Sequence, residues 1–225
     1  MNRSLKILII ILAVILVLYV ASELLIPVGA AWYIKREIKK RYPEAADVSV
    51  SVRAFPAFKL FSRKYSRLSI EAGGIKLEGI NFDTMKLDSR AYPNGTFEAV
   101  IGQGEISNFF SVAGSYLENP QVTIEDSQIR VIGQVDLGFG PVNVSSTGAL
   151  VPRNGREVFI VSDNITVGGG RVPGEYEAAV KHYISENPIF TVRQDLPFTI
   201  TAIKAGGGKL TITGDVDIEK ALKFK

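Results

Sequence analysis

The residue types that most catalytic and metal-binding chemistry requires are scarce in this sequence. The chain of 225 residues has no cysteine and a single histidine, His182. Without cysteine there is no disulfide scaffold, no zinc finger, no iron–sulfur centre and no thiol nucleophile. One histidine disfavours a multi-histidine metal site and a Ser-His-Asp triad, although it could still act as a base. The composition therefore disfavours hydrolytic and metal-dependent chemistry.

The remaining polar candidates have simpler explanations. His182 lies beside the apolar face of a predicted helix and not on it, which is typical of a surface histidine. Asp215 and Asp217 share one face of a predicted strand and could bind a cation, but acidic side chains on an alternating strand are usually solvated. No G-x-S-x-G, H-E-x-x-H or Walker A sequence occurs. We expect no catalytic residue, no cofactor and no metal.

Residues 1–34 predict a signal or anchor segment that enters a membrane. Residues 7–22 are uncharged, Glu23 interrupts the run, and residues 24–34 are again uncharged. A membrane span needs roughly 20 apolar residues and a signal peptide core about 7–15, so the sequence allows an uncleaved anchor or a cleaved signal peptide. We favour the anchor, because the second apolar stretch continues past the first suitable cleavage site.

Charge is distributed unevenly beyond this segment. Residues 34–76 carry eleven Lys and Arg against four Asp and Glu, a net +7, while residues 77–225 carry a net −5. This bias suits a domain held against an anionic bilayer, and it matches no nucleic-acid-binding motif. Arg3 and Lys6 favour export, so we expect the domain outside the cytoplasm, or secreted after cleavage. The basic flank at 35–41 favours the opposite orientation, with the domain in the cytoplasm. This flank fits an interfacial helix or a solvated stalk equally.

Residues 35–225 predict one domain made mostly of β-strands. Apolar and polar residues alternate with period two in many short runs, most clearly in residues 210–218. A change of face within residues 80–87 suggests a β-bulge or a bend. Turns are expected at Gly73-Gly74, Pro93-Asn94-Gly95-Thr96 and Gly206-Gly207-Gly208.

Two segments have helical spacing instead, residues 105–118 and residues 174–186, and Asn-Pro closes each. The pattern predicts an α+β, mostly β fold, in which a long curled antiparallel sheet wraps two amphipathic helices. Two short helices cover only part of the apolar face and would leave an elongated groove. Such a groove suits acyl chains, whose burial contributes about 0.8 kcal/mol per CH₂. A closed sandwich or barrel with a filled core would show the same alternation.

The order of motifs resembles that of a known family. A basic flank is followed by a V-x-V-x-V strand at 48–52, by Phe55-Pro56-Ala57-Phe58, and by a helix that begins near Ile106. This order is similar to that of the LmeA-like phospholipid-binding proteins of bacterial envelopes, whose fold is similar to the tubular lipid-binding (TULIP) group. The resemblance covers roughly residues 35–220. It implies a protein that binds phospholipid in an apolar groove and has no established catalytic centre. The family often has glycine before Phe-Pro, where this chain has Ala54.

Two sets of residues are candidates for lipid contact. Apolar residues that are expected to line the groove, each of which could instead be ordinary core, are Phe55, Phe58, Phe61, Phe82, Ile106, Phe109, Phe110, Leu117, Tyr176, Val180 and Tyr183. Basic residues that are expected to meet headgroups at the membrane surface are Lys59, Arg63, Lys64 and Arg67. The aromatics around Pro56 would form a membrane-touching lip or, alternatively, a core-anchoring loop with a solvated basic face.

We therefore expect a membrane-tethered or exported phospholipid-binding protein of the bacterial envelope, which holds or transfers lipid. Its expected partners are phospholipid and the membrane, and envelope-biosynthesis proteins are further candidates. Nucleic acid is not expected as a partner. The alternative is a non-catalytic structural or interaction β-sandwich domain of the envelope. An enzyme acting on envelope lipids or glycans is a third, disfavoured hypothesis, because it would need a carboxylate pair in a cleft.

Overall fold

Strands dominate the part of the chain that the structure describes. The structure is a computed structural model that describes residues 3–62, 64–77, 80–112, 118–125, 128–136, 141–168, 170–171, 182, 185–188, 190–194 and 196–223. The helical elements are α1 (Arg3–Arg41), η1 (Ala57–Ser62), α2 (Gln103–Val112) and α4 (Ile218–Lys223). The strands are β1 (Ala46–Arg53), β2 (Arg67–Leu77), β3 (Ile80–Ala91), β4 (Asn94–Gly102), β5 (Glu118–Glu125), β6 (Gln128–Asp136), β7 (Pro141–Arg153), β8 (Glu157–Val167), β9 (Gly170–Arg171), β10 (Phe190–Thr191), β11 (Phe198–Gly206) and β12 (Lys209–Asp217).

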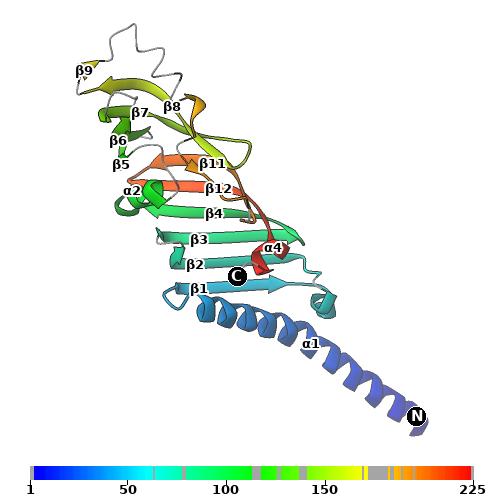
Figure 1. Cartoon of the computed structure of the whole chain (residues 1–225). Helices are drawn as coiled ribbons and strands as arrows, with labels where there is room; N and C mark the ends of the chain where they lie inside the picture. The colour runs from blue at the N-terminus through cyan, green and yellow to red at the C-terminus, as the bar shows by residue number, and fades with distance from the viewer. Residues whose placement is uncertain are drawn as a thin grey trace.

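These strands form two antiparallel sheets and not the single long sheet that the alternation suggested (Figure 1). Sheet A has the order β1-β2-β3-β4-β12-β11, and sheet B has the order β10-β8-β7-β6-β5 with β9 beside β8. The chain leaves sheet A after β4 through α2, builds sheet B, and returns to add β12 beside β4. Because β1 and β11, the edge strands of sheet A, do not pair with each other, sheet A is not a closed barrel.

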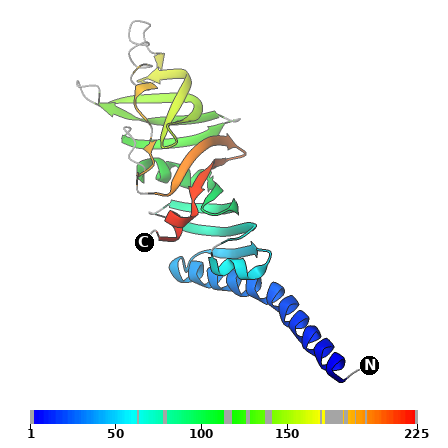
Figure 2. The same ribbon diagram turned by 90° about the vertical axis from the view of Figure 1, so that its right-hand side faces the viewer.

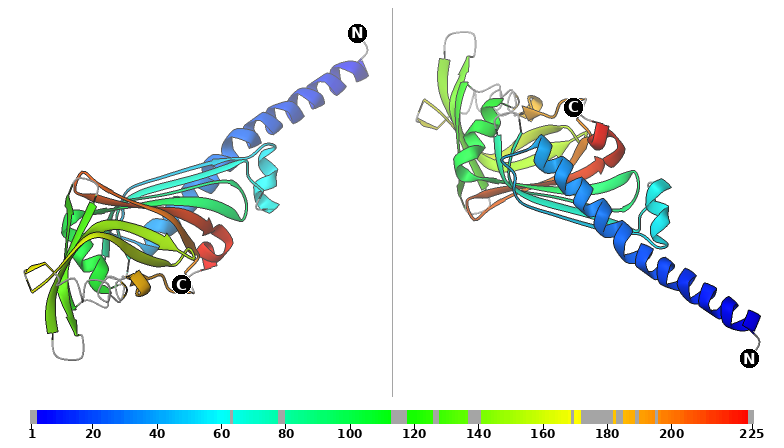
Figure 3. Two further views of the ribbon diagram at one scale, coloured as in Figure 1. Left: turned by 90° about the horizontal axis from the view of Figure 1, so that it is seen from above. Right: turned by 90° about the horizontal axis from the view of Figure 1, so that it is seen from below.

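Helix α1 is continuous across residue 34, where the sequence suggested a boundary between segments. Its N-terminal part stands clear of both sheets, and its C-terminal part packs along β1 (Figures 1 and 3). Ala31, Ile34 and Ile38 point into the core at helical spacing. The helix ends at Arg41, directly before the Tyr42-Pro43 dipeptide, since proline disfavours helical geometry in the residue before it. Of the helices described, α1 alone is long and apolar enough to cross a membrane.

Sheet A separates apolar from polar side chains. Its inner face carries Val52 and Leu68, which pair across β1 and β2 and are buried in the core. Its outer face carries charged residues joined by exposed ion pairs, which contribute little to stability. These pairs are Arg67–Asp88 at 3.5 Å and Lys86–Glu71 at 3.4 Å. The inner face is therefore the side on which an apolar ligand could bind.

One of the three expected turns is confirmed and two are wrong. Gly207 and Gly208 connect β11 to β12 with φ of +59° and +69°, a conformation that glycine adopts without steric cost. The β3–β4 turn instead lies at Tyr92-Pro93, and Asn94 already belongs to β4. The Asn-Gly signal failed there because proline also restricts the backbone to turn geometry.

The third expected turn, at Gly73-Gly74, is a continuous part of β2. The register between β2 and β3 is unbroken from Leu68 to Leu77. Gly74 has a φ of +61°, and Ala72 and Ile75 on either side of it are both buried although they lie three residues apart. The change of face that the sequence suggested is thus present in both strands, without a bulge between them.

The two predicted helices are only partly described. Helix α2 spans Gln103–Val112, whereas residues 118–120 already lie in β5, so Asn119-Pro120 does not end the helix as expected. Pro120 lies near the start of its strand, a position where proline is tolerated. Of the second predicted helix, 174–186, only residues 182 and 185–186 are described, and they are helical. A sheet that wraps two helices is therefore not what the described residues show.

Sheets A and B share one apolar core. The core runs from β1, beside α1, through β12 to Val131 and Ile160 of sheet B. Figure 2 shows sheet A and then sheet B following α1 along the molecule. Helix α2 contributes Ile106, which is fully buried. The sheets meet where β11 contacts β7, β6 and β5. The molecule thus presents a long apolar interior whose two ends lie at α1 and at sheet B.

Close packing at Gly214 gives a stability test. A Cβ at this position would collide with the carbonyl oxygen of Thr199 and press on the ring of Phe97, so Gly214→Ala should lower the free energy of unfolding by about 1–3 kcal/mol. Gly104 of α2 has open space around it, and Gly104→Ala should leave stability unchanged or slightly raised. Thermal unfolding of the full chain in micelles, followed by circular dichroism, measures both. Equal midpoints for the two variants would contradict this packing.

Candidate functional site

Two rows of apolar residues cross the inner face of sheet A at right angles to its strands. The pairing register aligns the first row as Val50, Ile70, Leu87, Phe97, Gly214 and Ile200. It aligns the second row as Ala72, Met85, Ala99, Ile212 and Ile203. Since neighbouring strands lie about 4.8 Å apart, the first row extends for about 24 Å. The rows make an apolar track from β1 to β11.

The middle of this track is only partly covered by the described elements. Ile70, Met85 and Leu87 remain partly exposed, whereas Phe97 and Ala99 beside them are buried. Helix α1 covers the β1 end, and α2 and α4 pack on other parts of the sheet. The three partly exposed apolar side chains leave a surface that an apolar ligand could cover.

The second row leads into a pocket between the two sheets. The pocket has a volume of about 310 Å³ and is lined by Ile129, Ala149, Leu150, Ile203, Lys204 and Ala205. Ile203, which pairs with Ile212, therefore belongs to both the row and the pocket. The volume lies at the lower end of the range for ligand sites. Apart from the exposed Lys204, the lining side chains are apolar, so the second row ends at a pocket with a cation beside it. Ala99 and Ile212, which lie between Met85 and this pocket in the row, are buried.

A small polar cluster lies beside the apolar track. The Tyr65 hydroxyl lies 2.9 Å from Ser89 Oγ, which donates a hydrogen bond to the carbonyl oxygen of Asn94 at 2.5 Å. Burial raises the pKa of Tyr65, the hydrogen bond with Ser89 opposes this in part, and Tyr92 adds to it. Tyr65 is therefore a neutral phenol at physiological pH. The buried hydroxyl of Tyr92 has no hydrogen-bond partner among the described residues.

Residues 54–62 and 64–65 belong to a loop, here called the base, which lies against α1. The amide of Ser66 donates to the carbonyl of Arg53 at 2.8 Å and closes the loop. Both carboxylate oxygens of Glu23 accept the amide hydrogen of Ala57, at 3.0 and 2.9 Å. Glu23 is the only acidic residue within residues 7–34. An ionised side chain in an apolar helix is costly unless it is paired, so this contact both satisfies Glu23 and fixes the base on α1.

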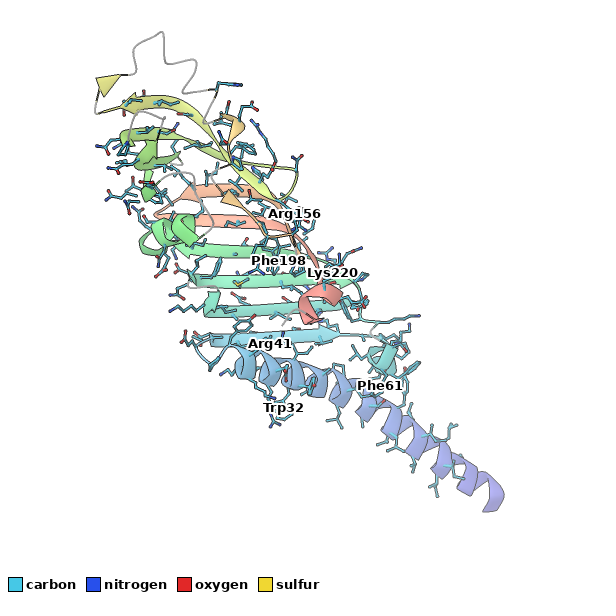
Figure 4. The ribbon with its side chains drawn as sticks, in the orientation of Figure 1. Trp32, Arg41, Phe61, Arg156, Phe198 and Lys220 are labelled. Atoms are coloured by element: carbon cyan, nitrogen blue, oxygen red, sulfur yellow. The ribbon has the colours of Figure 1, made fainter. Side chains whose placement is uncertain are left out.

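The three phenylalanines of the base point into solvent. Phe55, Phe58 and Phe61 are all exposed, and Figure 4 shows Phe61 beside α1 below the end of β1. Lys59 and Lys64 of the same loop are exposed as well. On α1, Trp32 points away from the sheet and stacks with Arg36, whose guanidinium carbon lies 5.3 Å from the ring centre. Apolar rings and cations therefore alternate along this end of the molecule.

The structure distributes the predicted groove residues over different places. Phe55, Phe58 and Phe61 lie on the base and not on the inner face of sheet A. Phe82 and Ile106 are buried in the core, where α2 packs on the sheet, so neither lines an open surface. The side chains of Phe109 and Phe110 and the residues Leu117, Tyr176, Val180 and Tyr183 lie outside the described residues.

The predicted headgroup residues also separate. Lys59 and Lys64 are exposed on the base, and Arg63 lies outside the described residues. Arg67 stands on the outer face of β2, where it pairs with Asp88 at 3.5 Å. Five site residues were not predicted from the sequence: Ile70, Met85, Leu87, Ile203 and Lys204. The alternation of the four apolar ones was visible, but only the register of the sheet shows that they share one track.

The polar candidates have structural roles where they are described. Asp217 Oδ1 accepts the amide hydrogen of Lys220 at 3.0 Å, which caps the start of α4. Asp215 is exposed on β12, and His182 is exposed as well. Within the described ranges, His, Asp and Glu form no group of three or more that could hold a metal ion.

The fold and the site together define a β-rich protein with a partly open apolar track and an N-terminal helix able to cross a membrane. A family model described as LmeA-like phospholipid-binding matches residues 21–215. The chain therefore belongs to this family, which indicates phospholipid as its ligand class and associates it with the cell envelope. No curated protein and no solved structure matches the chain. The matched region begins inside α1 and includes Glu23 and the base.

The contact between Glu23 and the base can be tested by amide hydrogen exchange. Glu23→Ala leaves the Ala57 amide without its charged acceptor, and hydrogen bonds to charged groups contribute about 1.5–3 kcal/mol. We expect the Ala57 amide to exchange at least about tenfold faster in the full chain. Glu23→Gln, which keeps one acceptor oxygen, should have a smaller effect. Unchanged exchange in Glu23→Ala would show that this contact does not hold the base.

Proposed function

We propose that this protein is a membrane-tethered, non-catalytic carrier of phospholipid in the bacterial cell envelope, which holds an acyl chain along the apolar track of sheet A and in the pocket between the sheets. The observation that carries the proposal is that the partly exposed apolar side chains and the pocket lie on the same face of sheet A, with the buried Ala99 and Ile212 between them. Partly exposed side chains at Ile70, Met85 and Leu87 adjoin buried ones, and the second row continues to Ile203 in the pocket.

The free energy available from such binding is substantial. Each buried CH₂ contributes about 0.8 kcal/mol, so covering ten of them would contribute about 8 kcal/mol before the cost of ordering the chain. Lys204, which lines the pocket and is exposed, offers a cation to a lipid phosphate. A structural β-sandwich would have no reason to leave an apolar track partly open, which favours lipid carriage over that alternative.

Tethering is supported by the surface of α1. Its large apolar side chains from Ile9 to Val20 are exposed, which in water would be unfavourable and in a bilayer is required. Because α1 is one helix that also packs on β1, an uncleaved anchor would hold sheet A at a fixed angle to the membrane. We further propose that the sheets lie outside the cytoplasm, as the leading Arg3 and Lys6 favour export.

Photocrosslinking from the inner face tests the lipid site. The chain has two methionines, Met1 and Met85, and Met85 lies in the second row. Photo-methionine, incorporated into the full chain in phosphatidylglycerol-containing vesicles, should form a phospholipid adduct on the peptide that contains Met85. Peptide-level mass spectrometry separates this adduct from any at Met1, which adjoins the anchor.

A matched variant moves the probe to the other face of the same strand. In the double variant Met85→Leu, Lys86→Met the diazirine occupies the exposed outer face, where Lys86 normally pairs with Glu71. We expect the adduct on this peptide to disappear. Equal adduct yields from the two faces, or no adduct from position 85, would contradict lipid binding along the track.

A further inference from the structure

The base carries an unusual concentration of exposed aromatic surface. Among the described residues outside α1, the three most exposed large apolar side chains are Phe61 at 80%, Phe55 at 72% and Phe58 at 59%. The next is Val161 at 47%. Three phenylalanines within seven residues make one apolar patch, and such patches mark sites of contact with a protein or a membrane.

The position of the base along α1 favours a membrane. The uncharged residues 7–22 of α1 have a length of about 24 Å, and Lys6 and Arg3 just before them can extend to the headgroups of the far leaflet. This part of the helix therefore reaches across a hydrocarbon core of about 30 Å. The next residue, Glu23, is the one that binds the amide of Ala57. If α1 spans the bilayer with this segment, the base is held at the boundary between hydrocarbon and headgroups.

The charges of the base agree with that depth. Exposed Lys59 and Lys64 flank the aromatic rings, and Trp32 and Arg36 lie further along the exposed face of α1. Aromatic rings are enriched at membrane interfaces, and each lysine or arginine near an anionic surface contributes about 1 kcal/mol. A protein partner would require no such match between helix length and the position of the base.

We propose that the base is an interfacial membrane-docking loop for an anionic bilayer. Phe55, Phe58 and Phe61 enter the outer edge of the hydrocarbon, while Lys59 and Lys64 meet lipid phosphates. The carboxylate of Glu23 holds the loop at this depth. Docking places the β1 end of sheet A against the bilayer surface. The proposal rests on the tether of the proposed function but not on lipid binding along the track.

The absence of cysteine from the chain makes the depth of the base directly measurable. A spin label on Phe61→Cys in the full chain, reconstituted into phosphatidylcholine vesicles with phosphatidylglycerol, reports collisions with oxygen and with a water-soluble nickel chelate. We expect a several-fold higher ratio of oxygen to nickel accessibility at position 61 than for Val161→Cys on β8. Both side chains are exposed, so neither substitution removes core packing.

Two further variants test the parts of the proposal. Adding Glu23→Ala to Phe61→Cys should lower the oxygen-to-nickel ratio, because the loop is no longer held at its depth. Adding Lys59→Glu and Lys64→Glu should lower it in vesicles with phosphatidylglycerol and leave it unchanged in phosphatidylcholine alone. An unchanged ratio in all of these variants would overturn the roles of Glu23 and the lysines.

Docking itself is overturned if the label at position 61 is as accessible to nickel as the label at position 161. That result in pure lipid would also be the one expected if the patch binds a protein. A label on Leu16→Cys, in the exposed apolar part of α1, separates the two proposals. If position 16 is buried in lipid and position 61 is not, only docking falls. If both lie in water, the tether has failed and docking with it.

Discussion

The apolar face of sheet A has to be removed from water, and the arrangement of the other elements follows from this constraint. Helix α1 covers it at β1, sheet B meets it at β11, and α2 inserts Ile106 between these ends. Ile70, Met85 and Leu87 stay partly exposed in the middle. A sheet that is covered at its ends and partly exposed at its centre offers an apolar surface that a ligand could cover without a preformed closed cavity.

Helix α1 has two parts with different surroundings, the lipid of a membrane and the sheet of the domain. Its N-terminal part exposes apolar side chains all around, as a helix in lipid must, and its C-terminal part is amphipathic against β1. Glu23 lies between these two parts of the helix, and its carboxylate accepts a hydrogen bond from the amide of Ala57. The one charge in the apolar run is thus a connection between the helix and the domain, because a buried or lipid-facing carboxylate requires a donor.

Sequence motifs predicted local structure well where a single residue type determines the backbone conformation. The alternation of β1 and β12 and the Gly207-Gly208 turn were correct, since φ above zero selects glycine. The same reasoning failed at Gly74, because a positive φ also occurs inside a paired strand when the neighbouring strand keeps its register. At Tyr92-Pro93, two turn signals lay next to each other, and only the pairing of Ala91 with Asn94 decided between them.

The sequence by itself determined the chemistry of this protein: no thiol, one histidine, an apolar N-terminal helix, one-faced strands, and motifs that resemble a phospholipid-binding family. Tertiary structure alone decided which of those faces came together. Alternation shows which residues of one strand share a face, but not which strands are neighbours. Only the pairing of β4 with β12 aligns Met85 with Ile203 in one track, and only the packing of η1 on α1 leaves Phe61 exposed while Phe82 and Ile106 are buried. These are contacts between residues distant in the chain, which no local spacing encodes.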